Sequence, residues 1–126
     1  MVKKLLHTRY RVTDLEKTVA FYRDVLGLQE VRRHTSGRGS QLVFFKAPGS
    51  EEEIEICKFD ESGPVVVGPD LTHLAFEVDN IDAAIAKLKE SGVTFNMEKT
   101  ETPVCWMAQF RDPGGNKLVV HKRKEK

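Results

Sequence analysis

Two histidines stand at the same place in two similar stretches of this sequence. His7 opens the stretch HTRYRVTDLE, and His73 opens HLAFEVDNID. In both stretches a residue that can cap a helix, Asp14 or Asn80, follows its histidine at the same spacing. Imidazoles are common metal ligands, and a duplicated unit can bring two of them together by internal symmetry. The sequence therefore predicts a repeated module with paired histidines as metal ligands.

Glu55 is the carboxylate that strand alternation groups with these histidines. In the predicted strand Glu53–Phe59, isoleucines alternate with Glu55, so the isoleucines can face a helix while Glu55 faces the other way. The same alternation leaves His7 and His73 on the side opposite the apolar residues of their own strands. We therefore expect these three side chains to line one concave surface. Two imidazoles and one carboxylate suit iron, and also zinc, nickel or manganese.

The last predicted strand, Lys117–Lys122, offers Val119 or His121 to the same surface. Val119 has no atom that can bind a metal. His121 lies on the same face as Val119 but one pleat further along, roughly 6.5–7 Å from the Val119 position. It becomes a fourth ligand only if the strand slips or a bulge intervenes. His121 is thus a candidate ligand, and its position beside a basic tail favours a solvent-facing or dimer-edge side chain.

Two βαβββ modules account for nearly the whole chain. Capping residues and closing glycines predict helices from Asp14 to Gly27 and from Asn80 to Gly92. The predicted strands cover Lys4–Val12, Leu28–His34, Gln41–Lys46, Glu53–Phe59, Leu71–Val78, Val93–Lys99, Val104–Arg111 and Lys117–Lys122. The fold class is therefore α+β, expected as a single domain over residues 1–126. Module one covers about 1–60, a Gly- and Pro-rich linker about 60–70, module two about 71–122, and a basic tail 122–126.

Composition excludes several classes of partner. The 126 residues include 20 Lys and Arg against 19 Asp and Glu, so the charge predicts no nucleic-acid partner. The two cysteines, Cys57 and Cys105, are not expected to form a disulfide. The start Met1-Val-Lys-Lys leads directly into a predicted strand, and no long apolar run follows. We therefore expect a cytoplasmic protein with no membrane segment.

Four segments carry a resemblance to a known family. They are Leu6-His7-Thr8, Ile54-Glu55, the stretch from His73 to Asn80, and Asp112-Pro-Gly-Gly-Asn-Lys-Leu. Together they resemble the vicinal oxygen chelate superfamily and, within it, the small bacterial glyoxalase I proteins, over essentially the whole chain. The resemblance implies two βαβββ modules in a curved mixed sheet around a divalent metal. It also implies a small-molecule substrate and a homodimer that completes the site.

The resemblance assigns roles to particular residues. His7, Glu55 and His73 correspond to three of the four family ligands, and Glu55 is also the catalytic proton acceptor. Val119 stands at the fourth ligand position. Arg11 stands where the family has an arginine for a substrate carboxylate.

Three aromatic residues are candidates for substrate binding. Phe59 replaces an asparagine of the family pattern. Strand alternation suggests that Phe59, Trp106 and Phe110 form an apolar wall for a flatter ligand.

Two functional classes follow from these residues. The first is a metal-dependent enzyme: a glyoxalase I-like lyase or isomerase that works through a metal-stabilised enediolate, or an Fe(II) dioxygenase with a 2-His-1-carboxylate set. The second is a metal-free ligand-binding protein of the bleomycin-resistance type. The retained His7, Glu55 and His73 favour the enzyme, whereas Val119 and the aromatic residues favour the binding protein.

Overall fold

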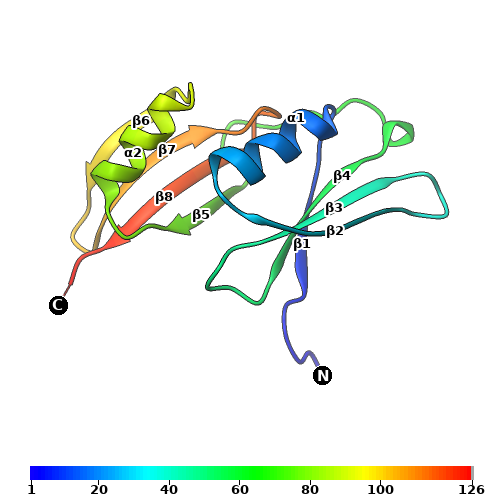
Figure 1. Cartoon of the computed structure of the whole chain (residues 1–126), viewed down its shortest axis with the longest axis horizontal. Helices are drawn as coiled ribbons and strands as arrows, with labels where there is room; N and C mark the ends of the chain where they lie inside the picture. Colours follow the sequence, from blue (N-terminus) through cyan, green and yellow to red (C-terminus); the bar gives the residue numbers. More distant parts are fainter. Residues whose placement is uncertain (126) are drawn as a thin grey trace. The chain divides into compact units, whose positions relative to one another are not determined.

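The computed structural model describes residues 1–125, which form two compact units, Met1–Val66 and the residues from Val67 onward. Each unit repeats the order strand, helix, three strands, as the sequence predicts (Figure 1). The chain therefore has the predicted α+β fold class with eight strands. These strands form two separate four-stranded sheets.

The first unit holds one mixed sheet and one helical segment. Its elements are β1 (His7–Arg11), α1 (Leu15–Ala20), the π-helical turn η1 (Phe21–Val25), β2 (Gln29–Thr35), β3 (Gln41–Lys46), β4 (Glu53–Lys58) and the 3₁₀ turn η2 (Asp60–Ser62). The strand order is β1-β4-β3-β2, with β1 parallel to β4 and the other pairs antiparallel. Because β1 and β4 are parallel neighbours, the first and last strands of the module lie side by side.

Local sequence explains the helical segment of the first unit. Asp14 caps it, since its side chain accepts a hydrogen bond from the Lys17 amide at 3.1 Å. The chain then widens into a π-helical turn, in which the Leu26 amide donates to the Phe21 carbonyl at 3.1 Å. Gly27, with φ of 76°, ends the segment in a conformation that favours glycine. The helix therefore begins and ends where the sequence predicts.

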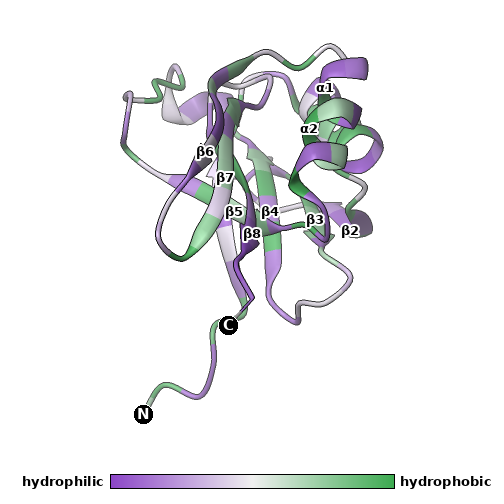
Figure 2. Cartoon of the chain, turned by 90° about the vertical axis from the view of Figure 1, so that its left-hand side faces the viewer, coloured by the Kyte–Doolittle hydropathy of each residue, from purple (hydrophilic) through white to green (hydrophobic). Residues whose placement is uncertain are grey.

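The second unit repeats this plan. Its elements are β5 (His73–Glu77), α2 (Ile81–Glu90), β6 (Phe95–Glu101), β7 (Cys105–Arg111) and β8 (Lys117–Arg123), in the sheet order β5-β8-β7-β6. Asn80 caps α2 by accepting from the Ala83 amide at 2.9 Å. The core of this unit includes Phe110 and Leu118, both with 0% exposure. Figure 2 shows the alternation of hydrophobic and hydrophilic residues along the strands and around both helices.

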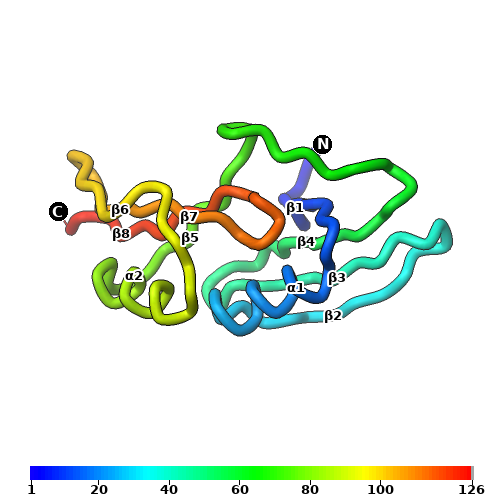
Figure 3. Tube along the Cα trace, turned by 90° about the horizontal axis from the view of Figure 1, so that it is seen from above, coloured from blue at the N-terminus to red at the C-terminus, as the bar shows by residue number. Residues whose placement is uncertain are grey.

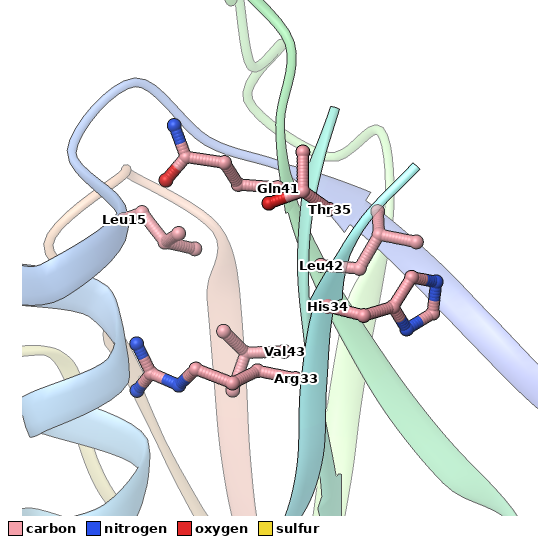
Figure 4. A pocket seen from close by; sticks show the side chains of 7 residues that line it. All are labelled: Leu15, Arg33, His34, Thr35, Gln41, Leu42 and Val43. Carbon is pink, nitrogen blue, oxygen red and sulfur yellow. The ribbon is translucent and has the colours of Figure 1, made fainter. Parts of the chain in front are cut away.

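Each sheet has one face towards its own helix and one away from it (Figure 3). In the first unit Arg33 and Val43 point towards α1, whereas His34 and Leu42 point to the opposite side (Figure 4). These residues surround a hollow of about 270 Å³ beside the start of α1. The side of each sheet away from its helix is here named the histidine face, because His7 and His73 belong to it through their strand register.

Strand ends differ from the predicted ones by a few residues. The first strand was expected from Lys4 but begins at His7, and Leu5 and Leu6 are each 63% exposed. Ladder pairing with β4 begins at His7, and the Leu6 carbonyl adds one further hydrogen bond, accepted from the Glu53 amide at 3.0 Å. Within residues 1–125, no helix is long and apolar enough to cross a membrane.

Replacing Phe110 with alanine tests the core of the second unit. Phe110 is fully buried, and its ring centroid lies 5.5 Å from that of Phe95. Loss of the ring leaves a cavity, so we expect Phe110→Ala to lower the free energy of unfolding by about 3–5 kcal/mol. Denaturant titration measures this change. The control Val104→Ala, at a side chain that is 70% exposed, should stay within about 0.5 kcal/mol of the parent; equal losses would contradict the assigned core.

Candidate metal and substrate site

The register of β1 against β4 places His7 and Glu55 on one face of the first sheet. His7 pairs with Glu53, and Arg9 pairs with Glu55. Paired residues on neighbouring strands point to the same side, so all four belong to the histidine face. Glu55 therefore lies one pleat along from His7, and its direct neighbour across the strands is Arg9.

Arg9 forms an ion pair with Glu55. The Arg9 Nε donates to Glu55 Oε2, and Nη2 donates to Oε1 at 3.4 Å. The Glu55 side chain is only 2% exposed, whereas the Arg9 side chain is 53% exposed. The hydrogen bond to Glu55 raises the pKa of Arg9, although desolvation of the guanidinium opposes this. A buried carboxylate is thus paired with a guanidinium that still reaches solvent.

Phe44 forms the centre of an aromatic group on the same face. The His7 ring meets it edge-on with centroids 5.7 Å apart, and the His34 ring stacks on it at 6.0 Å. The guanidinium of Arg32 lies 4.0 Å from the centroid of the Phe44 ring. This part of the face therefore combines aromatic rings with positive charge.

An apolar cluster continues the face beyond Phe44. Leu42, Phe44 and Cys57 are buried together, and Phe59 packs against them. Burial raises the pKa of the Cys57 thiol, with the nearby Glu55 carboxylate acting in the same direction. Cys57 is therefore a neutral buried thiol, and Cys57 and Cys105 are both free.

Arg11 binds the chain that follows β4. Its Nη1 donates to the carbonyl of Gly63 at 2.7 Å and to that of Phe59 at 3.4 Å, and Nη2 donates to that of Pro64 at 3.3 Å. This segment runs on the side of the sheet away from α1 (Figure 3). The guanidinium predicted to receive a substrate carboxylate is therefore bound to backbone carbonyls.

The second unit repeats the register with different side chains. His73 pairs with Lys117, Ala75 with Val119, and Glu77 with His121, with no shift along the ladder. Val119 thus stands to His73 as Glu55 stands to His7. His121 lies two pleats from the His73 position, about 13 Å along the strand, because neither the slip nor the bulge that would bring it closer is present. The structure does not bring His121 to the fourth ligand position.

Trp106 lies on the helix side of its sheet. It pairs with Lys122 in β8 and therefore shares a side with Phe110, opposite to Val119. The Nζ atoms of Lys99 and Lys124 lie 4.7 and 4.8 Å from the centroid of its ring. Phe59 thus packs on the histidine face of the first sheet, whereas Trp106 and Phe110 lie on the helix side of the second sheet.

The predicted ligands are divided between the two units. Within residues 1–125, the structure has no group of three or more His, Cys, Asp or Glu side chains arranged to hold a metal ion. The first unit supplies His7 and Glu55, and the second supplies His73. Val119, which is 2% exposed, has no donor atom. By donor type alone, the predicted residues suit a three-ligand site of two imidazoles and one carboxylate, and they lack the fourth donor of a four-ligand site.

Sequence reasoning placed Arg9 on the same side of its strand as His7 but gave it no role, and it did not identify Arg32. Arg9 follows His7 by two residues in the same strand, and this spacing was the sequence signal that both side chains point to one face. Its contact with Glu55 depends on the register between two strands 46 positions apart, and residue periodicity does not specify that register.

Comparison with known proteins identifies the family. Residues 4–120 match the Glyoxalase/Bleomycin resistance protein/Dioxygenase superfamily. The chain belongs to this superfamily. It is 29% identical over 129 residues to a lactoylglutathione lyase from Salmonella typhimurium, covering 97% of this chain and 94% of the relative.

Solved structures of two different kinds share the fold of this superfamily member. TnmS3, an antibiotic binding protein from a Streptomyces species, has a TM-score of 0.82 at 22% identity, covering 98% of each chain. The trypanothione-dependent glyoxalase I of Leishmania major has a TM-score of 0.81 at 24% identity, covering 96% of this chain and 87% of that one. An enzyme and a binding protein thus match almost equally well, and the side chains of the site must distinguish the two functions.

Glu53 gives the face a measurable pH dependence. Its carboxylate accepts a hydrogen bond from Arg32 Nη1 at 2.9 Å and forms an ion pair with Arg32 Nη2 at 2.8 Å. This contact lowers the pKa of Glu53, although desolvation opposes it. A lowered pKa stabilises the fold above the ordinary carboxyl pKa of about 4.3, and this contribution disappears as the pH falls through the folded-state value.

We therefore expect Glu53→Gln to lower the denaturation midpoint at pH 7, with the difference from the parent shrinking towards pH 3. Denaturant titrations at a series of pH values measure it. Glu52→Gln, in the exposed loop before β4, is the matched control and should show a smaller pH-dependent difference. A difference for Glu53→Gln that grows at low pH would contradict the assigned pairing.

Arg11 should hold the segment after β4 in place. Replacing it with methionine removes three hydrogen bonds from a charged donor to backbone carbonyls. We expect Arg11→Met to lower the free energy of unfolding by about 1–3 kcal/mol and to increase amide hydrogen exchange in residues 59–63. Arg38→Met is the control, because Arg38 only lies over the Phe59 ring at 5.5 Å. Unchanged exchange in Arg11→Met would show that the segment is held by other contacts.

Proposed function

We propose that this chain is a glyoxalase I-like lyase that acts on a small oxygenated substrate and holds a divalent metal through His7, Glu55 and His73. The observation that carries the proposal is Glu55, a carboxylate with 2% exposure on the same sheet face as His7. Buried charges require a partner, and carboxylates in such places are commonly metal-binding or catalytic. The lactoylglutathione lyase relative supports the reaction class.

The chain's own residues divide the chemistry between them. A divalent cation held there supplies Lewis-acid stabilisation of negative charge on a substrate oxygen. Glu55 is the proposed proton acceptor, because no second carboxylate occupies the Val119 position. Leu42, Phe44 and Phe59 offer an apolar surface for the rest of the substrate. We further propose a cytoplasmic homodimer, as the family resemblance implies.

A second candidate is a metal-free ligand-binding protein of the bleomycin-resistance type. Two observations favour it. Val119 is buried and apolar where a fourth ligand would stand, and Arg9 already neutralises Glu55 without a metal. The two functions differ in whether the three donors bind a cation.

Metal analysis separates these candidates. We expect about one transition metal per chain in protein purified without a chelator, and its loss in His7→Ala and His73→Ala. His34→Ala is the matched control for His7, because both imidazoles contact the Phe44 ring. His121→Ala is the control for His73. Metal retained in the His7→Ala, His73→Ala double variant would overturn the proposed ligands, and no metal after reconstitution would favour the binding protein.

The identity of the metal and a direct activity assay distinguish the lyase from the dioxygenase alternative. Nickel or zinc favours a lyase or isomerase, whereas iron favours the dioxygenase alternative. The metal-loaded protein should form or break down lactoylglutathione. Glu55→Gln should reduce this rate by at least about a hundredfold, in the range of a lost general base. A metal-loaded protein without this activity would move the proposal to another oxygenated substrate.

A further inference from the structure

The contact between Arg9 and Glu55 raises the question of what happens to it when a metal arrives. Both oxygens of the carboxylate accept from this one guanidinium. A cation that takes Glu55 as a ligand must approach the same oxygens. Arg9 and the metal therefore compete for one group.

We propose that Arg9 is the resident counter-ion of Glu55 and that divalent metal binding requires its displacement, so that Arg9 weakens the metal affinity of this chain. The inference rests on the proposed function, because it takes Glu55 as a metal ligand. It assigns to Arg9 the role of a positioning residue, which holds the buried carboxylate in place while no metal is bound.

The internal duplication supports a specific link between these two residues. Arg9 pairs with Glu55 across β1 and β4, and the equivalent pair across β5 and β8 is Ala75 with Val119. Where the carboxylate is replaced by an apolar side chain, the arginine is replaced as well. The guanidinium therefore accompanies the carboxylate, as expected if its role is to compensate that charge.

The difference in exposure between the two side chains indicates that Arg9, not Glu55, moves when a metal binds. Glu55 is 2% exposed and is held in the sheet, whereas 53% of the Arg9 side chain is accessible to solvent. A guanidinium on a flexible stem can leave for water at small cost, but the buried carboxylate cannot. Arg32, on the same face, already pairs with Glu53 and is not free to take the place of Arg9.

Zinc titration of full-length variants tests the competition. We expect Arg9→Met to bind Zn²⁺ at least tenfold more tightly than the parent, measured by competition with a chromophoric chelator. Arg33→Met is the control and should bind like the parent, because Arg33 points to the helix side of the same sheet and pairs with Glu30. Glu55→Gln in the Arg9→Met background should abolish the gain.

The outcomes distinguish this inference from the proposed function. Equal affinities in the parent and Arg9→Met, both lost on His7→Ala, overturn the inference and leave the metal site standing. Failure of both proteins to bind zinc overturns the proposed function and the inference with it. Tight binding by Arg9→Met alone supports competition between Arg9 and the metal, but it overturns the proposed function, because the unmodified chain would then be metal-free.

A measurement on the unmodified protein covers the case in which Arg9→Met fails to fold. The Arg9 Nε–H group should give a distinct side-chain signal in a ¹H–¹⁵N NMR spectrum while it donates to Glu55. Saturation with zinc should move this signal or broaden it away. A signal that stays in place at saturation overturns the displacement.

Discussion

A nearly buried carboxylate must be paired with positive charge, and this requirement organises the first unit. Glu55 lies on the central part of the sheet, between β1 and β3, where water cannot solvate it well. Arg9 supplies the charge from β1, and the parallel register of β1 and β4 places the two side chains directly opposite. Any function of this face must either use this pair or break it.

The two modules have the same strand register, but their histidine faces carry different side chains. In the second unit the equivalent positions are Ala75 and Val119, so this sheet requires no charge compensation there. His73 keeps its place as the counterpart of His7, with Lys117 as its neighbour across the strands and the apolar Val119 one pleat further along β8. The two halves of the chain thus differ in chemistry while keeping one register, and the arginine–carboxylate pair occupies these positions in the first half only.

Much of the architecture could be predicted from the sequence. Helix caps at Asp14 and Asn80, and the closing Gly27, are local signals that depend on neighbouring residues, and the structure has them as predicted. Strand alternation also grouped Glu55 with His7 correctly, because side-chain period is a property of the strand itself.

The remaining features depend on contacts between distant strands. Alternation alone grouped Trp106 with Phe59, whereas the ladder with β8 puts Trp106 on the helix side of its sheet. The pairing of Arg9 with Glu55, and the use of Arg11 to hold backbone carbonyls, likewise require a register and a loop path that periodicity does not contain. Correctly predicted strands and helices therefore did not specify which side chains are in contact across the sheet.

The fold is common to glyoxalase I proteins and to an antibiotic binding protein, so the difference between such functions must come from a few side chains. In this chain the balance rests on the charge around Glu55. A guanidinium and a divalent cation satisfy the same carboxylate, but only the cation leaves coordination positions open for substrate oxygens. With Arg9 in place, Glu55 is part of a neutral pair beside an apolar cluster, which suits ligand binding. With Arg9 displaced, as we propose, Glu55 would be available as a ligand for Lewis-acid chemistry.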